Sequence, residues 1–212
     1  MRITGGSFRS RTLRAPRGRE TRPTSDRVRE ALFGILSSED AVKGARVLDL
    51  YAGTGALALE ALSRGAAEAT LVESSRDALD VIRHNTRTLE VGALARVIAG
   101  DVRTAVRRLR GPYDLVLVDP PWSLVDDGEA PAAIAALVAQ GSLAERALLV
   151  LEHASRSSAP SIAGLAARST RRYGDTSLTF YQPDVQPMQP PQGDDAAGRG
   201  GDMGGKSPDG IG

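Results

Sequence analysis

The chain contains no cysteine and only two histidines, His84 and His153. Without cysteine it has no disulfide, no Cys-based zinc site and no thiol nucleophile, and two histidines are too few for a His-rich metal site, so we expect no bound metal. No apolar run approaches the ~20 residues needed to cross a bilayer. The N-terminus also lacks the apolar segment and cleavage site of a secretory signal. These absences predict a cytoplasmic protein without membrane contacts, whose chemistry rests on carboxylates, backbone groups and a bound cofactor.

The rest of the composition is that of an ordinary globular protein. Its 212 residues suffice for one domain with a sizeable core but are too few for two large ones. The hydrophobic fraction is 41% and the charged fraction is 25%, both within the usual range for a folded domain. We therefore expect a single folded domain and a monomer.

The net charge of +1 conceals an uneven distribution along the chain. Residues 1–30 carry nine arginines against three carboxylates, whereas residues 183–212 carry two basic and five acidic side chains. A preference for arginine over lysine explains the residue type but not this clustering. A basic segment on a nearly neutral body is typical of nucleic-acid binding, and the candidate contacts are Arg9, Arg11, Arg22 and Arg27. For Arg22 and Arg27, contact with a cofactor carboxylate or ordinary surface charge remains open.

Composition also divides the chain into three regions. Residues 1–22 are punctuated by Gly and Arg and alternate weakly, which predicts a small hairpin or extended arm. The domain is expected over residues 23–182, and its first helix begins after Pro23, with Asp26 in the first turn, where the helix dipole favours a carboxylate. An apolar stripe at helical spacing follows, formed by Val28, Ala31, Leu32, Ile35 and Leu36. Residues 183–212 are rich in Pro and Gly and almost free of apolar residues, which predicts a disordered tail.

Beyond residue 45, short apolar runs alternate with helical stretches. The expected strands are 47–50, 69–72, 96–99, 115–118 and 147–151, and the expected helices are 56–63, 76–89, 102–109 and 131–140. Strands that are apolar on both faces and separated by helices predict an α/β fold with a mostly parallel sheet covered on both sides. The segments 169–173 and 177–181 flank Gly174-Asp175, a turn signal that predicts an antiparallel hairpin at the sheet edge.

A glycine-rich turn follows the first expected strand, in the sequence Val47-Leu-Asp-Leu-Tyr-Ala-Gly-Thr-Gly-Ala56. Gly53 and Gly55 suit a backbone that turns tightly beside a ligand at a helix start. This spacing alone also fits a dinucleotide site. Asp49 favours a different ligand, because its carboxylate would repel a pyrophosphate but attract an ammonium or sulfonium group.

Two more carboxylates follow the next two expected strands. Glu73 could accept both hydroxyls of a ribose, which fits either NAD or S-adenosylmethionine, and Asp101 could accept a proton from an adenine amine. Each could instead be a simple helix N-cap. Three carboxylates at successive strand ends favour the ligand site over three unrelated caps.

The fourth expected strand ends in Asp119-Pro120-Pro121-Trp122. Two prolines stop the strand and hold the chain rigid outside its carboxyl end, where open α/β sheets bind ligands. Asp119 can accept a proton, the proline carbonyls can accept hydrogen bonds, and Trp122 offers a flat face. This combination suits an aromatic amine that must donate two N–H bonds beneath a methyl donor. A bare Asp-Pro-Pro would more often only end a strand, but here it follows the Asp49 turn.

An Asp-Pro-Pro-aromatic box after such a turn resembles the amino-group methyltransferases of DNA and RNA. The stretches 2–13, 21–33 and 49–65 are similar to the bacterial 16S rRNA guanine-N2 methyltransferase family called RsmD, and the resemblance extends from Arg2 to about Tyr181. Trp122 departs from the Phe or Tyr expected there, which keeps the stacking face but enlarges it. The segment from Pro183 onward lies outside the family pattern.

The resemblance implies a Rossmann-like class I fold with seven strands, S-adenosylmethionine as cofactor, and methylation of the N2 atom of guanine 966 in 16S rRNA of the small ribosomal subunit. By position it assigns cofactor binding to Asp49, Tyr51, Gly53, Gly55, Glu73 and Asp101, and the catalytic box to Asp119, Pro120, Pro121 and Trp122. Two alternatives remain. One is an adenine-N6 DNA methyltransferase, whose box usually begins with Asn, and the other is a non-catalytic RNA-binding or ribosome assembly factor.

Overall fold

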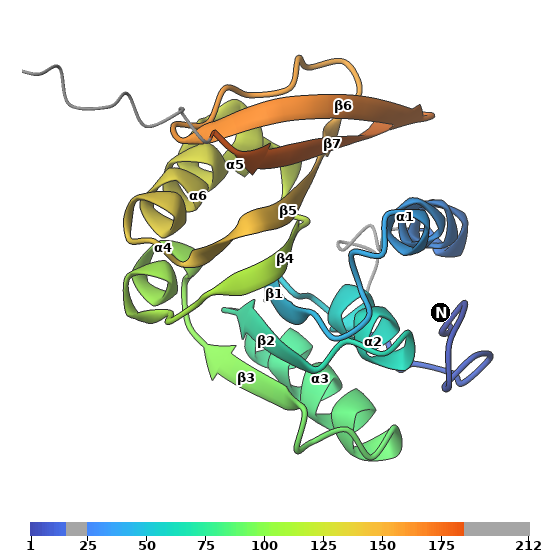
Figure 1. Ribbon diagram of the computed structural model, residues 1–212. Coiled ribbons are helices and arrows are strands. Elements are labelled where there is room, and N and C mark those ends of the chain that lie inside the picture. The colour runs from blue at the N-terminus through green and yellow to red at the C-terminus, as the bar shows by residue number, and fades with distance from the viewer. Residues whose placement is uncertain (16–24, 185–212) are drawn as a thin grey trace, which may run out of the picture.

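A seven-stranded sheet forms the centre of the protein in the computed structural model, which describes residues 1–15 and 25–184 (Figure 1). The strands lie in the order β3-β2-β1-β4-β5-β7-β6. Their bounds are β1 Arg46–Leu50, β2 Glu68–Glu73, β3 Ala95–Ala99, β4 Tyr113–Val118, β5 Leu143–Ala154, β6 Leu165–Tyr173 and β7 Thr176–Pro183. The first five strands pair in parallel, and β7 pairs antiparallel with both β5 and β6. The predicted parallel sheet with an antiparallel edge hairpin is confirmed.

The helices cover both faces of the sheet (Figure 1). On one face lie α1 Asp26–Ser38, α2 Ala56–Ser63 and α3 Arg76–Thr88, which contribute to one buried apolar cluster. On the other face lie α4 Val102–Ala105, the 3-10 turn η1 Val106–Arg108, α5 Trp122–Asp126 and α6 Glu129–Ala139, which contribute to a second cluster. No helix within residues 1–15 and 25–184 is long and apolar enough to span a bilayer.

Several predicted boundaries were wrong, each for a local reason. The single helix expected over 102–109 tightens into η1 after Ala105, as helix ends commonly do. Helix α6 begins at Glu129 after Gly128, whose φ of 79° ends the preceding turn, so Pro131 falls within the first helical turn, where proline is tolerated. Strand β5 has 12 residues, far more than 147–151, and its pairing with β4 shifts register between Tyr113 and Leu115.

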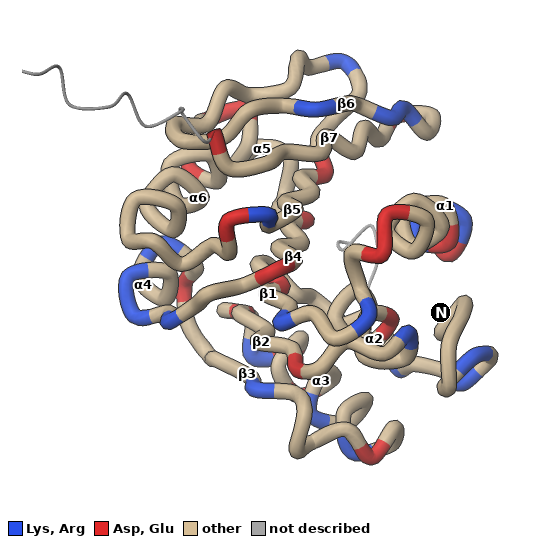
Figure 2. Tube along the Cα trace, in the orientation of Figure 1, with Lys and Arg blue, Asp and Glu red and all other residues tan. Residues whose placement is uncertain are grey.

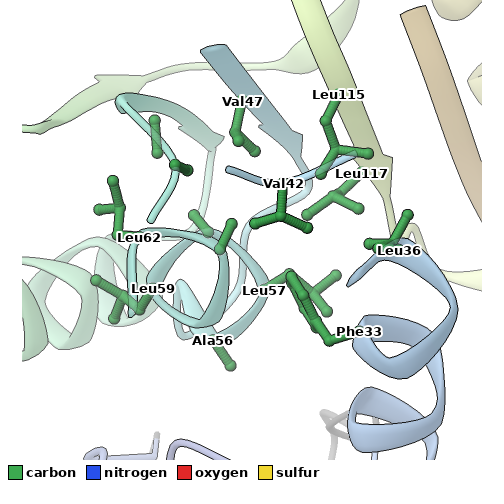
Figure 3. Close-up of a cluster of buried hydrophobic side chains, with 14 of the residues drawn as sticks. Phe33, Leu36, Val42, Val47, Ala56, Leu57, Leu59, Leu62, Leu115 and Leu117 are labelled. Carbon is green, nitrogen blue, oxygen red and sulfur yellow. The ribbon is translucent and has the colours of Figure 1, made fainter. Parts of the chain in front are cut away.

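Helix α1 packs its apolar side chains against α2 and the sheet. Ser25 caps its N-terminus, where the side chain accepts a hydrogen bond from the Val28 N–H, and Asp26 lies in the first turn as predicted. Figure 3 shows Phe33 and Leu36 directed toward Leu57 of α2 and Leu117 of β4.

The predicted stripe of α1 is only partly correct, because the buried residues are Val28, Arg29, Leu32, Phe33 and Leu36. Phe33, and not Ala31, lies on the buried face of α1. Arg29 lies on the same face and is completely buried.

The N-terminal segment is part of the domain core and not a separate arm. Arg2 and Thr12 form an antiparallel bridge, consistent with the predicted hairpin. Ile3 and Leu13 are 1% and 3% exposed and belong to the same apolar cluster as α1 and α2. The expected division between residues 1–22 and the domain therefore has no counterpart in the packing of residues 1–15.

A buried carboxylate fastens this segment to the helices. Glu60 of α2 accepts hydrogen bonds from the Thr4 N–H at 2.8 Å, the Thr4 hydroxyl at 2.7 Å, the Gly5 N–H at 2.8 Å and Arg64 Nε at 2.9 Å. Arg29 Nε of α1 lies 3.5 Å from Glu60 Oε2, and both side chains are completely buried. Arg29 also donates to the Arg2 carbonyl. One ion pair thus joins the N-terminal segment, α1 and α2.

Replacing Glu60 with Gln should destabilise the protein strongly, because the change removes the fully buried carboxylate that pairs with the fully buried Arg29. We expect the free energy of unfolding to fall by about 3 kcal/mol, the lower end of the range for broken buried pairs, since Asp26 still contacts Arg29. Chemical denaturation measures the change. The matched control is Glu68→Gln, which breaks the exposed ion pair of Glu68 with Arg46. It should lower the free energy of unfolding by less than about 1 kcal/mol. Equal losses for both variants would contradict this account.

Candidate active site

Four carboxylates lie at or just beyond the carboxyl ends of the first four strands. Asp49 pairs in register with Leu71 of β2 and Leu117 of β4, so it lies one pleat inside the edge. Glu73 ends β2, and Asp101 follows β3 by two residues. The Asp119 N–H lies 3.4 Å from the Leu50 carbonyl, which places Asp119 beside the start of the glycine turn. The structure therefore brings the ends of these strands to one edge, as predicted.

The turn between β1 and α2 uses three residues in the left-handed region. Their φ angles are 63° at Tyr51, 55° at Gly53 and 75° at Gly55. A Cβ atom on Gly55 would lie 3.1 Å from Leu71 Cδ2, so both its backbone angle and its packing favour glycine. Gly55 also caps α2 without a side-chain hydrogen bond. The turn therefore points the first N–H groups of a helix at the space outside the sheet, which is a common place to hold a ligand.

Asp49 is a buried carboxylate with one oxygen unsatisfied. Its Oδ2 accepts a hydrogen bond from the Ala58 N–H at 3.1 Å, whereas Oδ1 has no partner among the described residues. Burial, together with the nearby charges of Asp119 and Glu73, raises the pKa of Asp49 to about 8. A buried acceptor without a partner is costly, so Asp49 is suited to a positively charged group or a bridging water at the turn.

Glu73 holds the glycine turn in place. Its Oε2 accepts from the Gly53 N–H at 2.8 Å, and its Oε1 accepts from the N–H groups of Ser74 at 2.8 Å and Ser75 at 2.7 Å. A carboxylate has about four acceptor positions, and three are used here. The remaining position on Oε2 can accept one further hydroxyl.

Asp101 is the N-cap of α4, which is the alternative role that the sequence analysis left open for it. Its Oδ1 accepts from the Arg103 N–H at 3.0 Å at the start of α4, and it forms an ion pair with Arg103 Nε at 3.3 Å. Arg103 also contacts Glu129 at 3.1 Å. Tyr51 lies near these charges, and its partial burial, together with Asp101 and Glu129, raises its pKa to about 12. Tyr51 therefore remains a neutral phenol beside the edge.

The Asp-Pro-Pro-Trp segment leaves β4 and turns directly into α5. Pro120 is buried, Pro121 is exposed and occupies the N-cap of α5, and Trp122 is the first helical residue and half-buried. The sequence did not predict this helix. The guanidinium carbon of Arg156 lies 5.7 Å from the centre of the Trp122 ring. One side of the indole therefore faces a cation.

The arginines proposed for RNA contact differ in their surroundings. Arg9, Arg11 and Arg27 are all exposed at the surface, and Arg11 donates to the Thr88 carbonyl at 2.8 Å. Arg22 lies outside the described residues. Figure 2 shows basic residues in the N-terminal segment and also on β6, where the exposed arginines are Arg168, Arg171 and Arg172. Exposed arginines therefore also occur on β6, outside the segment that the sequence singled out.

Two residues of this region were missed by the sequence reasoning. Asn85 of α3 is buried and contacts both Arg14 and the glycine turn, with Nδ2 3.0 Å from the Thr54 carbonyl and Oδ1 2.8 Å from the Arg14 N–H. It lies on the apolar face of a strongly amphipathic helix, and a polar residue there is a signal that could have been used. Arg156 follows β5 in a polar loop and gives no such signal.

The edge fits S-adenosylmethionine in its chemistry. The unsatisfied Asp49 oxygen suits a cationic ligand, the positive-φ residues Gly53 and Gly55 let the backbone turn tightly beside it, and Glu73 retains an acceptor for a hydroxyl. Among the residues that the structure describes, no group of three or more His, Cys, Asp or Glu side chains could hold a metal ion.

Comparison with known proteins identifies the family. A model of the family described as Conserved hypothetical protein 95 matches residues 1–182. The chain belongs to this family. The resemblance to RsmD-type methyltransferases is thereby confirmed.

Named relatives cover most of the chain. It is 36% identical over 187 residues to "Ribosomal RNA small subunit methyltransferase D" of Escherichia coli (strain K12), which covers 88% of this chain and 91% of that protein. The Haemophilus influenzae protein of the same name is 31% identical over 157 residues, with 72% and 78% covered.

Solved structures share the fold. The Escherichia coli protein described as "Putative methyltransferase yhhF" superposes with a TM-score of 0.76 at 36% identity and covers 88% of this chain and 99% of that one. A hypothetical protein of Thermus thermophilus gives a TM-score of 0.68 at 32% identity, with 85% and 98% covered. The strand order and these likenesses show the Rossmann-like class I methyltransferase fold.

Replacing Asp49 with Asn tests whether the buried carboxylate serves a cationic ligand. The folded protein holds a proton on Asp49 up to its pKa of about 8, whereas the unfolded chain releases it near 3.8. Asp49 therefore lowers stability progressively as pH rises between these values. The Asn variant lacks this loss, so its melting temperature relative to wild type should rise between pH about 6 and about 8.

The affinity for S-adenosylmethionine should depend on pH in the opposite direction, in favour of the wild-type protein at higher pH. Wild type should gain affinity relative to the Asn variant as Asp49 ionises, by roughly tenfold between pH about 6 and about 7.5. Calorimetry measures both proteins, and the variant controls for titration of the ligand itself. A ratio of affinities that does not change with pH would remove Asp49 from the ligand site.

Proposed function

We propose that this protein is an S-adenosylmethionine-dependent methyltransferase that modifies the exocyclic N2 atom of a guanine in small-subunit ribosomal RNA, at position 966 of 16S rRNA. The observation that carries the proposal is the placement of Asp119-Pro-Pro-Trp122 directly beside the Asp49 turn at one edge of a class I sheet. The two proteins of the family named above as small-subunit ribosomal RNA methyltransferases support the substrate class.

The residues around the turn would hold the cofactor. Asp49 provides negative charge, the Gly53–Gly55 turn provides close backbone approach, and Glu73 accepts a ribose hydroxyl. Asp101 caps α4 and forms an ion pair with Arg103, so contact with an adenine amine would use its second oxygen. When bound, S-adenosylmethionine supplies an electrophilic methyl group on a positively charged sulfur.

The Asp-Pro-Pro-Trp segment would present the guanine to that methyl group. The base leaves its neighbours in the RNA and stacks on Trp122, as flipped bases do on aromatic side chains. The two N–H groups of N2 donate hydrogen bonds to Asp119 and to the Pro120 carbonyl. This arrangement turns the nitrogen lone pair toward the methyl carbon. As the N–C bond forms and the S–C bond breaks, N2 becomes acidic, and Asp119 accepts the released proton.

One experiment tests both the reaction and the target. Small ribosomal subunits and free 16S rRNA from a strain that lacks this modification are incubated with the protein and labelled S-adenosylmethionine. The product nucleoside is then identified by mass spectrometry, and we expect N2-methylguanosine at a single site. Label on adenine in DNA would favour an adenine-N6 methyltransferase instead. Cofactor binding without transfer to any nucleic acid would favour an assembly factor.

Asp119→Ala should slow methyl transfer by roughly 10²–10⁴-fold, the usual loss for a positioned proton acceptor. Affinity for S-adenosylmethionine should barely change, because Asp119 serves the base. Single-turnover rates and calorimetry separate the two effects. Asp127, an exposed residue just after α5, supplies the matched control, and Asp127→Ala should transfer methyl at the wild-type rate. An undiminished single-turnover rate for Asp119→Ala would refute its role.

Trp122→Ala should weaken RNA binding and lower turnover, because a stacked base contributes on the order of 1–3 kcal/mol. Trp122→Phe keeps a flat ring and should recover most of the activity. Filter binding with RNA and steady-state kinetics measure the two effects. Equal behaviour of the Ala and Phe variants would mean that stacking is not the role of Trp122.

A further inference from the structure

Helix α5 is short and makes few contacts with the core. It contains five residues, Trp122–Asp126, and only Val125 is buried. A helix of this length is not stable by itself, so the orientation of Trp122 depends on contacts made by neighbouring side chains. Trp122 and Asp126 stand four residues apart and therefore lie on the same face of the helix.

Arg156 contacts both of these side chains at once. Its guanidinium carbon lies 5.7 Å from the centre of the Trp122 ring, and its Nη2 lies 3.3 Å from Asp126 Oδ2. The hydroxyl of Ser157 donates to the other oxygen, Asp126 Oδ1, at 2.9 Å. Arg156 and Ser157 thus both contact the Asp126 carboxylate at the end of α5. Arg156 also lies over the Trp122 ring at the start of this helix.

The loop that carries Arg156 is itself fixed to the sheet edge. Ser155 donates from its N–H to the Asp175 carbonyl and from its hydroxyl to the Gly174 carbonyl, both at 2.8 Å. Arg172 of β6 donates to the Ser155 carbonyl. A continuous series of contacts therefore runs from the β6–β7 turn through this loop to Trp122. The position of Trp122 is tied to the far edge of the sheet.

We propose that Arg156 is a positioning residue for the target base. Its guanidinium lies over the Trp122 ring and pairs with Asp126 on the same face of α5, so it sets the orientation of the ring on which the base would stack. The planar guanidinium of arginine can stack on a ring while its edge donates to a carboxylate, whereas lysine offers only a point charge. The identity of the stacked group as a guanine rests on the proposed function, but the contact between Arg156 and Trp122 does not.

The indole can be observed directly, because Trp122 is the only tryptophan in the chain. Its fluorescence therefore reports one site, in the full-length protein and without RNA. In Arg156→Ala the side chain over the ring is removed, and the acrylamide quenching constant should rise. Arg156→Lys should give an intermediate value. Arg146→Ala removes the same charge from an exposed position in the first half of β5 and should leave the quenching constant unchanged.

Kinetics distinguish positioning from simple attraction of RNA. With saturating ribosomal RNA, Arg156→Ala should lower kcat about fivefold, the factor expected for one exposed cation–π contact, while affinity for S-adenosylmethionine stays at the wild-type value. Arg156→Lys should recover part of kcat. Arg146→Ala, with the same net charge as Arg156→Ala, should keep the wild-type kcat.

Two results would overturn the proposal. In one, Arg156→Ala and Arg146→Ala have the same quenching constant and the same kcat. In the other, Arg156→Ala raises only KM, with a weaker salt dependence, which would make Arg156 a phosphate contact. Failure of the wild-type protein to methylate any RNA would instead overturn the proposed function, and the quenching comparison would still decide whether Arg156 holds Trp122.

Discussion

The buried ion pair between Arg29 and Glu60 is the interaction on which the arrangement of this domain depends. Glu60 accepts hydrogen bonds from Thr4 and Gly5, and it lies in the helix that the Gly53–Gly55 turn begins. The same carboxylate therefore fixes the N-terminal segment, α1 and the helix behind the proposed cofactor site. Charges so deep are costly unless they are paired, and the oxygens of Glu60 are satisfied by Thr4, Gly5 and Arg64, whereas Arg29 Nε and Nη1 make no hydrogen bond within the described residues. This cost makes the N-terminal segment an obligatory part of the fold, and the arginines that it exposes are held on a rigid base.

The sheet and the glycine turn could be predicted from the sequence because their signals are local. Strands that are apolar on both faces and separated by helices leave few other arrangements, and glycines before a helix indicate a tight turn. The burial of Arg29 could not be predicted in this way. Its partner Glu60 is 31 residues away in the sequence, and an arginine in an Arg-rich segment looks like one more surface charge. Only the packing of α1 on α2 distinguishes the buried Arg29 from the other arginines of this segment.

The candidate site shows the same division. The sequence placed Asp49, Glu73 and Asp119 at one edge because carboxyl ends of parallel strands meet there, and the structure confirms that placement. It left open whether Asp101 was a ligand contact or a cap, and the hydrogen bond that Asp101 accepts from the Arg103 N–H shows that it caps α4, a role that does not exclude a ligand contact. It did not find Arg156, because a contact across 34 residues between a polar loop and a short helix leaves no periodic pattern.

The surroundings of Asp49 and of Trp122, at the two ends of this sheet edge, differ in burial and in the kind of contact that holds them. The roles proposed for the two residues follow from this difference. Around Asp49 the groups are buried and backbone-bound, and one carboxylate oxygen is unsatisfied, so this end is suited to one small ligand that supplies the missing partner. Around Trp122 the groups are half-exposed and held by side chains from a loop. In the proposed reaction a large RNA would approach here and stack a base, and exposed contacts that can adjust suit that step. The rigid end would hold the methyl donor, and the tethered indole would hold the acceptor base against it.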